Sequence, residues 1–404
     1  MTNQTQTLAP ELTSVFADLH IHIGRTGKGA PVKISGSRDL TFANIAKEAA
    51  ERKGIHLIGI IDCHAPGVQE DIIASLDQGE MRELAEGGIA YKETTILLGT
   101  ELEIREPGMG PAHLLAFFPD LKTISAFTGW LEKRMKNVSL SSQRVYAPAH
   151  ALQEEVYARG GMVIPAHIFT PHRSIYGSCA PRIADVLDPE LISAVELGLS
   201  ADSEMAGLIS ELDRYTILTN SDAHSLGKIG REYNELLLQA PNYREFEKAL
   251  QGIEGRKVAG NYGLNPRLGK YHRTYCGGCS YIIDESEAAV DRCPYCGSPK
   301  LVRGVLDRIR SIADRPAPQI PPHRPAYHYQ VPLEFIPGLG PAKLKLLLQN
   351  FGTEMNILHR VPEEELARVV GEELAGHISA ARGGKLRLES GGGGIYGKVA
   401  KSQN

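Results

Sequence analysis

Six of the fourteen histidines in this chain stand, with acidic residues, at the ends of short apolar runs. The first run ends in Asp18-Leu19-His20-Ile21-His22. Residues i and i+2 of an extended segment point to the same side, so His20 and His22 present two imidazoles together. Imidazoles and carboxylates are ligands for divalent metals. An isolated pair would equally suit an exposed strand edge, but this pair is not isolated.

Residues of the same chemical types follow the later apolar runs: Asp62 and His64, Glu101, His113, His167, Glu196, and Asp222 with His224. The carboxyl ends of barrel strands are where loops converge and sites are built. Other histidines, such as His56, His150 and His359, are scattered. The pattern therefore predicts a metal cluster at one end of a sheet or barrel.

The elements that must position these residues alternate between strand-like and helix-like patterns. The expected strands are Val15–Ile21, His56–Asp62, Thr95–Glu101, His113–Phe118, Met162–His167, Ala194–Leu197 and Thr216–Ser221. The expected helices are Thr41–Lys53, Gln78–Glu86, Ile124–Asn137, Ala149–Arg159, Ser203–Arg214 and Tyr243–Gln251. This order predicts an α/β fold with parallel strands and crossover helices, in a barrel or a doubly wound sheet.

Composition is that of an ordinary globular protein, with 404 residues, 42% hydrophobic and 23% charged. This length predicts two or three domains. The net charge of −4 is uneven, because residues 255–330 carry 12 basic against 6 acidic residues. No apolar run could span a bilayer and the N-terminus lacks a secretory signal pattern, so we expect a cytoplasmic, nucleoid-associated protein with no membrane partner.

Four of the six cysteines form two Cys-x-x-Cys pairs, Cys276 with Cys279 and Cys293 with Cys296. Each pair puts two thiolates on one tight turn, and two turns supply the four soft ligands of a tetrahedral zinc site. A redox dithiol is the alternative. We expect a structural zinc in a module of residues 261–315, closed to substrate by its four sulfurs.

The remaining chain divides into a Pro-rich linker at 316–332, a helical domain at 333–390 and a disordered tail at 391–404. The helical domain opens with a Pro-Gly-Leu-Gly turn containing Gly338 and Gly340, followed by Lys343 and Lys345. Free backbone N–H groups at a helix N-terminus bind phosphate. This turn is the expected DNA-binding element, and Glu363–Ile378 is a degenerate second copy.

The motifs also carry a family likeness. Asp18-Leu-His-Ile-His22, Asp62-Cys-His64, Gly99-Thr-Glu101, His113-Leu-Leu, Pro165-Ala-His167 and Ser221-Asp-Ala-His224 resemble, in order, those of the PHP (polymerase and histidinol phosphatase) domain. The likeness covers residues 13–260 and implies a distorted (β/α)7 barrel. The 337–351 segment resembles a helix-hairpin-helix. A PHP domain followed by a zinc module and a helical tail resembles the endonuclease Q family, which nicks DNA 5′ of deaminated bases (uracil, hypoxanthine, xanthine) and abasic sites.

The resemblance implies two or three divalent metals, Zn, Mn or Mg, with histidine ligands favouring Zn, Mn or Fe over Mg. His20, His22, Glu101 and Asp222 would hold one metal, and Glu101, His113 and His167 a second. His64 and His224 would belong to a third, but Arg25 and Lys28 stand where the family has another histidine. Asp62 is either a ligand or an orienter of a histidine. Asp222 and Glu101 are thus the expected catalytic residues.

Substrate contacts are less determined. His172 and Arg173 are candidates to clamp the scissile phosphate, or else a loop-stabilising pair. The basic loop with Arg25, Lys28, Lys33 and Arg38 could meet phosphates or be an ordinary surface loop.

An extruded base needs a pocket. Tyr146, Tyr176, Tyr262 and Tyr271 are its stacking candidates, with a buried structural role as the alternative for each. The competing functions are a phosphatase for a small phosphomonoester and a DNA-binding scaffold with a decayed site. DNA is the expected partner, and replication or repair proteins are further candidates.

Overall fold

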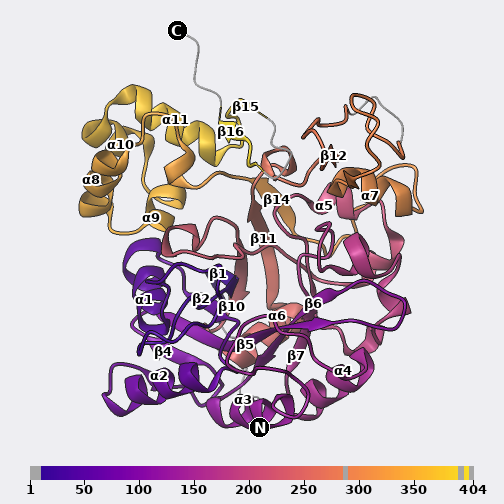
Figure 1. Ribbon diagram of the computed structural model, residues 1–404. Helices are drawn as coiled ribbons and strands as arrows, with labels where there is room; N and C mark the ends of the chain where they lie inside the picture. The colour runs from indigo at the N-terminus through magenta and orange to yellow at the C-terminus, as the bar shows by residue number, and fades with distance from the viewer. Residues whose placement is uncertain (1–10, 285–289, 390–394, 400–404) are drawn as a thin grey trace, which may run out of the picture.

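The computed structural model describes residues 11–284, 290–389 and 395–399 (Figure 1). Its largest element is a ten-stranded sheet with the strand order β14-β11-β10-β1-β2-β5-β4-β3, to which β6 is added through β5 and β7 through β6. Its strands are β1 (Thr13–Ile21), β2 (Leu57–Ile60), β3 (Arg82–Glu83), β4 (Ile89–Tyr91), β5 (Thr94–Ile104), β6 (Ala112–Phe118), β7 (Met162–Pro165), β10 (Tyr233–Leu238), β11 (Lys257–Gly263) and β14 (Ala326–Tyr329).

Strand directions in this sheet are mixed. The strands β1, β2 and β5 are parallel, as the alternation predicted. The pairs β5–β6, β6–β7, β1–β10 and β10–β11 are antiparallel. A separate parallel pair joins β8 (Val195–Glu196) to β9 (Ile217–Leu218). The α/β class is confirmed, whereas the expectation of parallel strands joined by crossover helices holds only for part of the sheet. Between β5 and β6 the connection is short, which allows antiparallel pairing.

The curve of the sheet continues beyond its ladders through single backbone hydrogen bonds. The Ile168 N–H donates to the Glu196 carbonyl at 2.9 Å, next to β8. The Ala223 N–H, after β9, donates to the His20 carbonyl at 3.1 Å. These bonds draw the ends of β7, β8 and β9 toward the end of β1. The number of barrel strands stays a prediction, since ladders in the described ranges do not close the ring.

An irregularity in the β1–β2 pairing determines which face of the sheet His20 and His22 occupy. The β1–β2 pairing is irregular between Asp18 and Ile21. Val15, Ala17 and Leu19 belong to one buried apolar cluster, whereas Ile21 belongs to the other. The shift therefore changes which face the odd residues occupy, as bulges near active sites do. It lets His20 and His22 follow the face that the odd residues occupy earlier in the strand.

Helices cover the outside of this first module: α1 (Phe42–Lys47), which a π-helical turn continues to Lys53, α2 (Pro66–Asp77), α3 (Leu121–Leu131), α4 (Ala149–Ala158), α5 (Ser203–Ala206) and α6 (Tyr243–Gln251). Figure 1 shows α2, α3 and α4 along one edge of the molecule. The expected helix at Gln78–Glu86 is wrong. The helix begins earlier, at Pro66, where a proline suits the first helical position, and the later residues form β3.

The middle module contains β12 (Tyr275–Cys276), β13 (Leu301–Val302) and α7 (Val305–Ile312). The 316–332 segment, expected to be a linker, returns to the main sheet, because its strand β14 pairs in parallel with β11. Residues 326–331 contain no proline, so their N–H groups are free to form a ladder. This pairing attaches the chain that follows the middle module to the main sheet.

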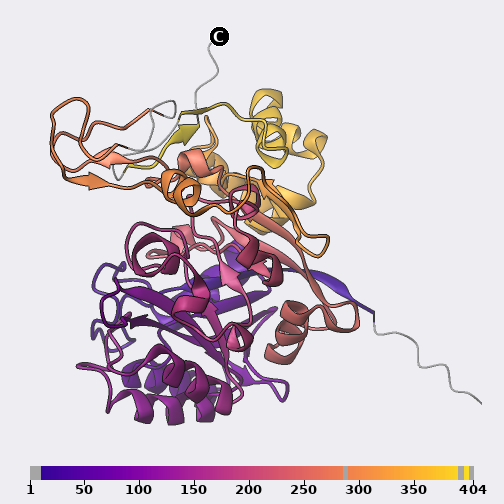
Figure 2. The same ribbon diagram turned by 90° about the vertical axis from the view of Figure 1, so that its right-hand side faces the viewer.

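The C-terminal module consists of α8 (Pro341–Phe351), α9 (Glu354–His359), α10 (Glu363–Val370) and α11 (Glu372–Arg382), followed by β15 (Leu388–Glu389) and β16 (Lys398–Val399). It packs on the first module, where the His359 ring lies 4.4 Å from that of Phe16 and Lys53 pairs with Glu354 at 3.0 Å. Both smaller modules lie at one end of the molecule (Figure 2). Within the expected disordered tail, residues 398–399 pair with β15; residues 391–394 and 400–404 lie outside the described residues.

Candidate active site

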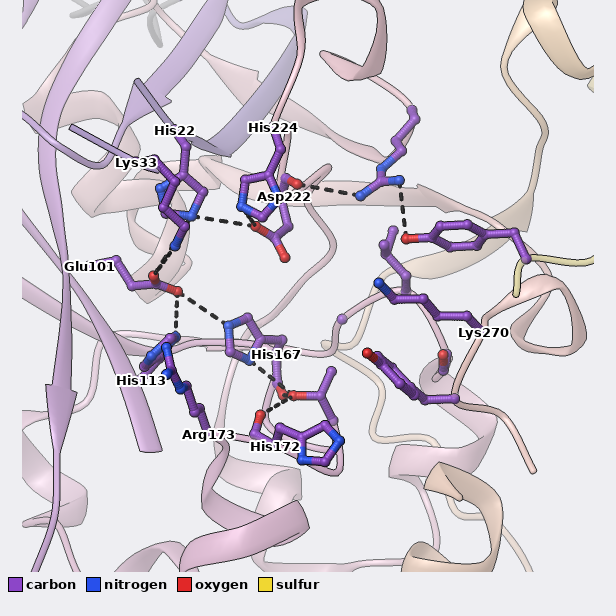
Figure 3. Close-up of a pocket in the computed structure, with 17 residues that line it drawn as sticks. His22, Lys33, Glu101, His113, His167, His172, Arg173, Asp222, His224 and Lys270 are labelled. Carbon is purple, nitrogen blue, oxygen red and sulfur yellow. Dashed lines mark hydrogen bonds and ion pairs between the residues drawn. The ribbon is translucent and has the colours of Figure 1, made fainter. Parts of the chain in front are cut away.

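Six of the nine sequence-predicted active-site ligands line one cavity of about 240 Å³ (Figure 3): His22, Glu101, His113, His167, Asp222 and His224. His20 and His22 come from the end of β1, Glu101 from β5, His113 from β6, and His167 and Asp222 from the loops after β7 and β9. The Nε2 atoms of His20 and His22 each lie 3.5 Å from Asp222 Oδ1. The same two atoms lie 3.6 and 3.7 Å from the Glu101 carboxylate. His20, His22 and Glu101 form one group of ligand-type side chains, and Asp222 forms an adjoining group with His22 and His224.

A second group shares Glu101. Its Oε1 atom lies 2.8 Å from His113 Nδ1 and 3.2 Å from His167 Nε2. All three side chains are buried. Because one carboxylate oxygen faces His113 and His167 while the other faces His22, Glu101 is placed to bridge two neighbouring cations.

The donor atoms of this cavity suit divalent metals. The Nε2 atoms of His20 and His22, which face the Glu101 and Asp222 carboxylates, are buried and have no hydrogen-bond partner, which is costly for a polar atom unless it binds an ion. Burial lowers the pKa of His113 to about 4, so this imidazole is neutral, the form that ligates metals. Burial opposes ionisation of Glu101, but hydrogen bonds from His113 and His167 and the charge of Lys33 hold its pKa well below the usual value.

Two carboxylates fix the histidines from behind. Glu196 Oε2 accepts a hydrogen bond from His20 Nδ1 at 2.9 Å, and Glu196 Oε1 accepts one from the His167 backbone N–H at 3.0 Å. Asp62 Oδ2 accepts from His22 Nδ1 at 3.1 Å and from the Ile23 N–H at 2.8 Å. Such contacts set the tautomer and direct Nε2 toward the ion. Asp62 therefore lies where an orienter lies, and Glu196, which the sequence placed only at a strand end, joins it.

The backbone is strained at this site. His167, Asp222 and Arg173 have φ values of +32°, +45° and +55°, a region that residues with a Cβ seldom occupy. Such strain gathers at functional sites, where surrounding contacts over-determine it.

Of the two histidines expected at a third metal, the described structure groups His224, but not His64, with other ligand-type side chains. His224 Nε2 lies 3.6 Å from Asp222 Oδ1 and could join a group with His22 and Asp222, both of which already serve the first group. His64 is buried, and its Nδ1 lies 2.8 Å from Thr100 Oγ1. No described group of three ligand-type side chains includes His64.

The remaining wall of the cavity carries aromatic rings and cations. His172 and Arg173 line it, and Arg173 Nε lies 3.4 Å from Glu103. Lys270 faces the cavity from the side opposite Glu101 (Figure 3). Its Nζ lies 5.0 Å from the ring centre of Tyr271 and 5.5 Å from that of Tyr396.

No protein-family model matches the sequence. An uncharacterized protein of Bacillus subtilis, YqxK, is 50% identical over 390 residues, which cover 96% of this chain and all of the relative. The uncharacterized protein MJ0043 of Methanocaldococcus jannaschii is 34% identical over 248 residues, which cover 57% of this chain and 31% of that protein.

Two crystal structures match nearly the whole chain. One is the lesion-specific endonuclease PfuEndoQ of Pyrococcus furiosus, with 32% identity, a TM-score of 0.81, and coverage of 96% of this chain and 95% of that one. The other is endonuclease Q with a 27-mer duplex substrate that has an abasic lesion at the active site, with 32% identity, a TM-score of 0.82 and 96% coverage of both chains. This chain belongs to the endonuclease Q family.

One of the four tyrosines proposed for base stacking lines the cavity of this endonuclease Q family member, and the other three do not. Tyr271 lines the cavity. Tyr176 is buried with its hydroxyl 2.7 Å from Glu211, Tyr262 stacks on Tyr233, and Tyr146 is half exposed, and none of these three lines the cavity. Tyr396, Arg231 and Lys270 line it but were not singled out from the sequence. Tyr396 could not be recognised from the sequence, because it lies far along the chain from the other motifs and no local pattern distinguishes it.

Arg231 connects this wall to the turn that carries Asp222. Its Nε donates to the Ser221 carbonyl at 2.7 Å and its Nη2 to the Asp222 carbonyl at 3.3 Å. Its Nη1 also lies 3.3 Å from the Tyr396 hydroxyl. The C-terminal segment is thereby attached to the strained turn that carries Asp222.

The four cysteines of the middle module converge. Cys276 and Cys296 have their Sγ atoms 3.6 Å apart, as do Cys279 and Cys293. Four thiolates at about 2.3 Å from a tetrahedral zinc would lie roughly 3.8 Å apart. The spacing fits such an ion.

The helical module of this endonuclease Q family member has two hairpin turns, one followed by basic residues and the other by acidic residues. Gly338, with φ of +82°, and Gly340 are exposed before α8, and Lys343 and Lys345 are exposed in its first turns. The second turn, at Gly371 between α10 and α11, is followed by Glu372 and Glu373. Acidic side chains there repel phosphate, so the first hairpin is the better candidate for DNA contact.

Proposed function

We propose that this protein is a metal-dependent DNA repair endonuclease that hydrolyses the phosphodiester on the 5′ side of a deaminated base or an abasic site. The observation that carries the proposal is the pair of histidine groups sharing Glu101 at the bottom of a cavity with a cationic, aromatic wall. Family membership supports it, since PfuEndoQ is lesion-specific and the related complex contains abasic DNA.

In this proposal the bound metals and the surrounding side chains have different roles. Two divalent metals held by the histidines, Glu101 and Asp222 would supply an activated water and neutralise charge on the phosphate. On the protein side, Glu196 and Asp62 keep the histidines oriented. Arg173 and His172 lie at the rim, where Arg173 can exchange its contact with Glu103 for a phosphate oxygen. We also propose zinc for the four-cysteine site, in a structural role.

The wall explains how deaminated bases would be selected. Lysine and arginine side chains donate hydrogen bonds and accept none. Uracil, hypoxanthine and xanthine each have a carbonyl oxygen where the parent base has an amino group. An extruded base between Tyr271 and Tyr396 would place that position near Lys270 or Arg231. A carbonyl oxygen accepts a hydrogen bond from these cations, whereas an amino group finds only other donors there. An abasic site has no base, so it brings no amino group that these donors would exclude.

A nicking assay tests the activity. The protein is incubated with Mn²⁺ and with duplexes that contain uracil, an abasic site or neither. Lesion-dependent nicking on the 5′ side is expected, and Asp222→Ala should abolish it while DNA binding persists. An exposed variant, Glu190→Gln, serves as the control. Phosphate release from a small monoester without any nicking would support the phosphatase alternative instead.

A second assay tests the base pocket. Lys270→Met should reduce the preference for uracil over cytosine about tenfold or more, because one wrong hydrogen-bond partner costs about 1–3 kcal/mol. Cleavage at abasic sites should change little. Unchanged discrimination in both Lys270→Met and Arg231→Met would reject the donor wall.

A further inference from the structure

Lys33 is the cation nearest the shared carboxylate. Its Nζ lies 3.3 Å from Glu101 Oε2 and 2.6 Å from Ser142 Oγ, and its side chain is 15% exposed. Figure 3 shows it on the same side of the cavity as His22, directed at Glu101. Ser142 also donates a short hydrogen bond to Glu101 Oε2. The ammonium therefore stands inside the metal cavity, not on the surface.

The loop that carries Lys33 is held in place. The Lys33 N–H donates to the Ile23 carbonyl at 2.8 Å, and the Ser141 N–H donates to the Val32 carbonyl at 3.0 Å. A Cβ on Gly24 would lie 1.9 Å from the Ser37 carbonyl oxygen, so the loop can close only with glycine there. Ser142 itself has a φ of +55°. Backbone contacts on both sides thus determine where the ammonium lies.

The other cations of this loop have different partners. Lys28 is exposed and pairs with Glu70 at 2.7 Å, and Arg25 donates to the Gly29 carbonyl at 3.0 Å. Only the Lys33 side chain, of these three, lines the cavity. Lys28 is therefore a matched control on the same loop.

We propose that Lys33 adds a fixed positive charge to the active site and binds a non-bridging oxygen of the scissile phosphate. The ammonium lies beside Glu101, the carboxylate that two of the described ligand groups share, so it faces the place where a phosphate held by those groups would bind. A phosphate bound between two cations at Glu101 would lie beside Lys33 Nζ. The ammonium then exchanges one acceptor, Glu101 Oε2, for another, the phosphate, and no covalent step is involved.

This inference rests on the proposed phosphodiesterase function, so its test uses two kinds of readout. The first is Lys33→Met, with Lys33→Arg as the conservative variant and Lys28→Met as the control. Removing one pre-organised donor to a developing charge lowers kcat by about 10²- to 10³-fold. We expect that loss in Lys33→Met on uracil-containing duplex and on bis(p-nitrophenyl) phosphate, partial recovery in Lys33→Arg, and no change in Lys28→Met.

The second readout does not need turnover. Calorimetric binding of inorganic phosphate to the Mn²⁺-loaded protein should weaken about tenfold or more in Lys33→Met. Elemental analysis should give the same metal content in wild type and variant. Equal phosphate affinity with and without Lys33 would overturn the inference. If the wild type cleaves neither phosphodiester, the proposed function fails, while the phosphate titration still decides the role of Lys33.

Discussion

Glu196 gives the sharpest test of the metal site, because it contacts both histidine groups without lying among the ligands. Three buried donors converge on it: His20 Nδ1 at 2.9 Å, the Asn220 side-chain amide at 2.8 Å and the His167 backbone N–H at 3.0 Å. Glu196→Gln preserves the volume but replaces one acceptor oxygen with a donor. At least one of the three donors then faces an N–H group, which costs about 1–3 kcal/mol when buried.

That cost should appear mainly as lost metal affinity. Loss of a carboxylate behind a ligating histidine lowers metal affinity about 10- to 100-fold, or roughly 1.4–2.7 kcal/mol. The assay is a Mn²⁺ titration against a chromophoric chelator, because oxygen- and nitrogen-binding Mn²⁺ avoids the four-thiolate site. Asp62→Asn, behind His22, should give a loss of the same size, and the exposed Glu190→Gln none.

One result would refute this reasoning. If Glu196→Gln folds normally by circular dichroism and binds Mn²⁺ within twofold of wild type, then Glu196 does not orient His20 toward a metal. The assignment of Glu196 as the residue that positions His20 would then be rejected.

Three further predictions concern other parts of the chain. Burial raises the pKa of Glu232 from 4.5 to about 7, so the folded state binds this proton more tightly than the unfolded state does. The free energy of unfolding should therefore fall by roughly 3 kcal/mol as pH rises from about 4.5 to 7. Glu232→Gln should remove this pH dependence in urea titrations, and an equal pH dependence in wild type and variant would contradict the prediction. Lys343→Glu combined with Lys345→Glu should weaken DNA binding on lesion-containing and plain duplex alike and lower the salt slope by about 2, as measured by fluorescence anisotropy; an unchanged slope would exclude the hairpin from the interface. Cys279→Ser should lose one zinc by elemental analysis and destabilise the middle module, with Mn²⁺ binding at the histidine site retained; loss of both metals would show that the two sites are not independent.

The strands that carry ligands could be located from local sequence, and the ones that do not were missed. The ends of β1, β5 and β6 were found because each is a dense apolar run that finishes in a ligand-type residue. The strand β11 was missed, since Lys-Val-Ala-Gly-Asn-Tyr-Gly has two glycines and little apolar character. Its strand conformation comes from pairing with β10 and β14, which no local pattern encodes.

The sequence by itself determined the chemistry of the site: the types, order and spacing of the histidines and carboxylates, and the two Cys-x-x-Cys turns. Only the tertiary structure decided which carboxylate stands behind which histidine, that Lys33 enters the cavity, and that Tyr396 joins Lys270 in its wall. The physical reason is distance along the chain. Ligand identity is a property of each residue, whereas Glu196 meets His20 across 176 positions, and that contact exists only after the sheet has curved and brought its strand ends together.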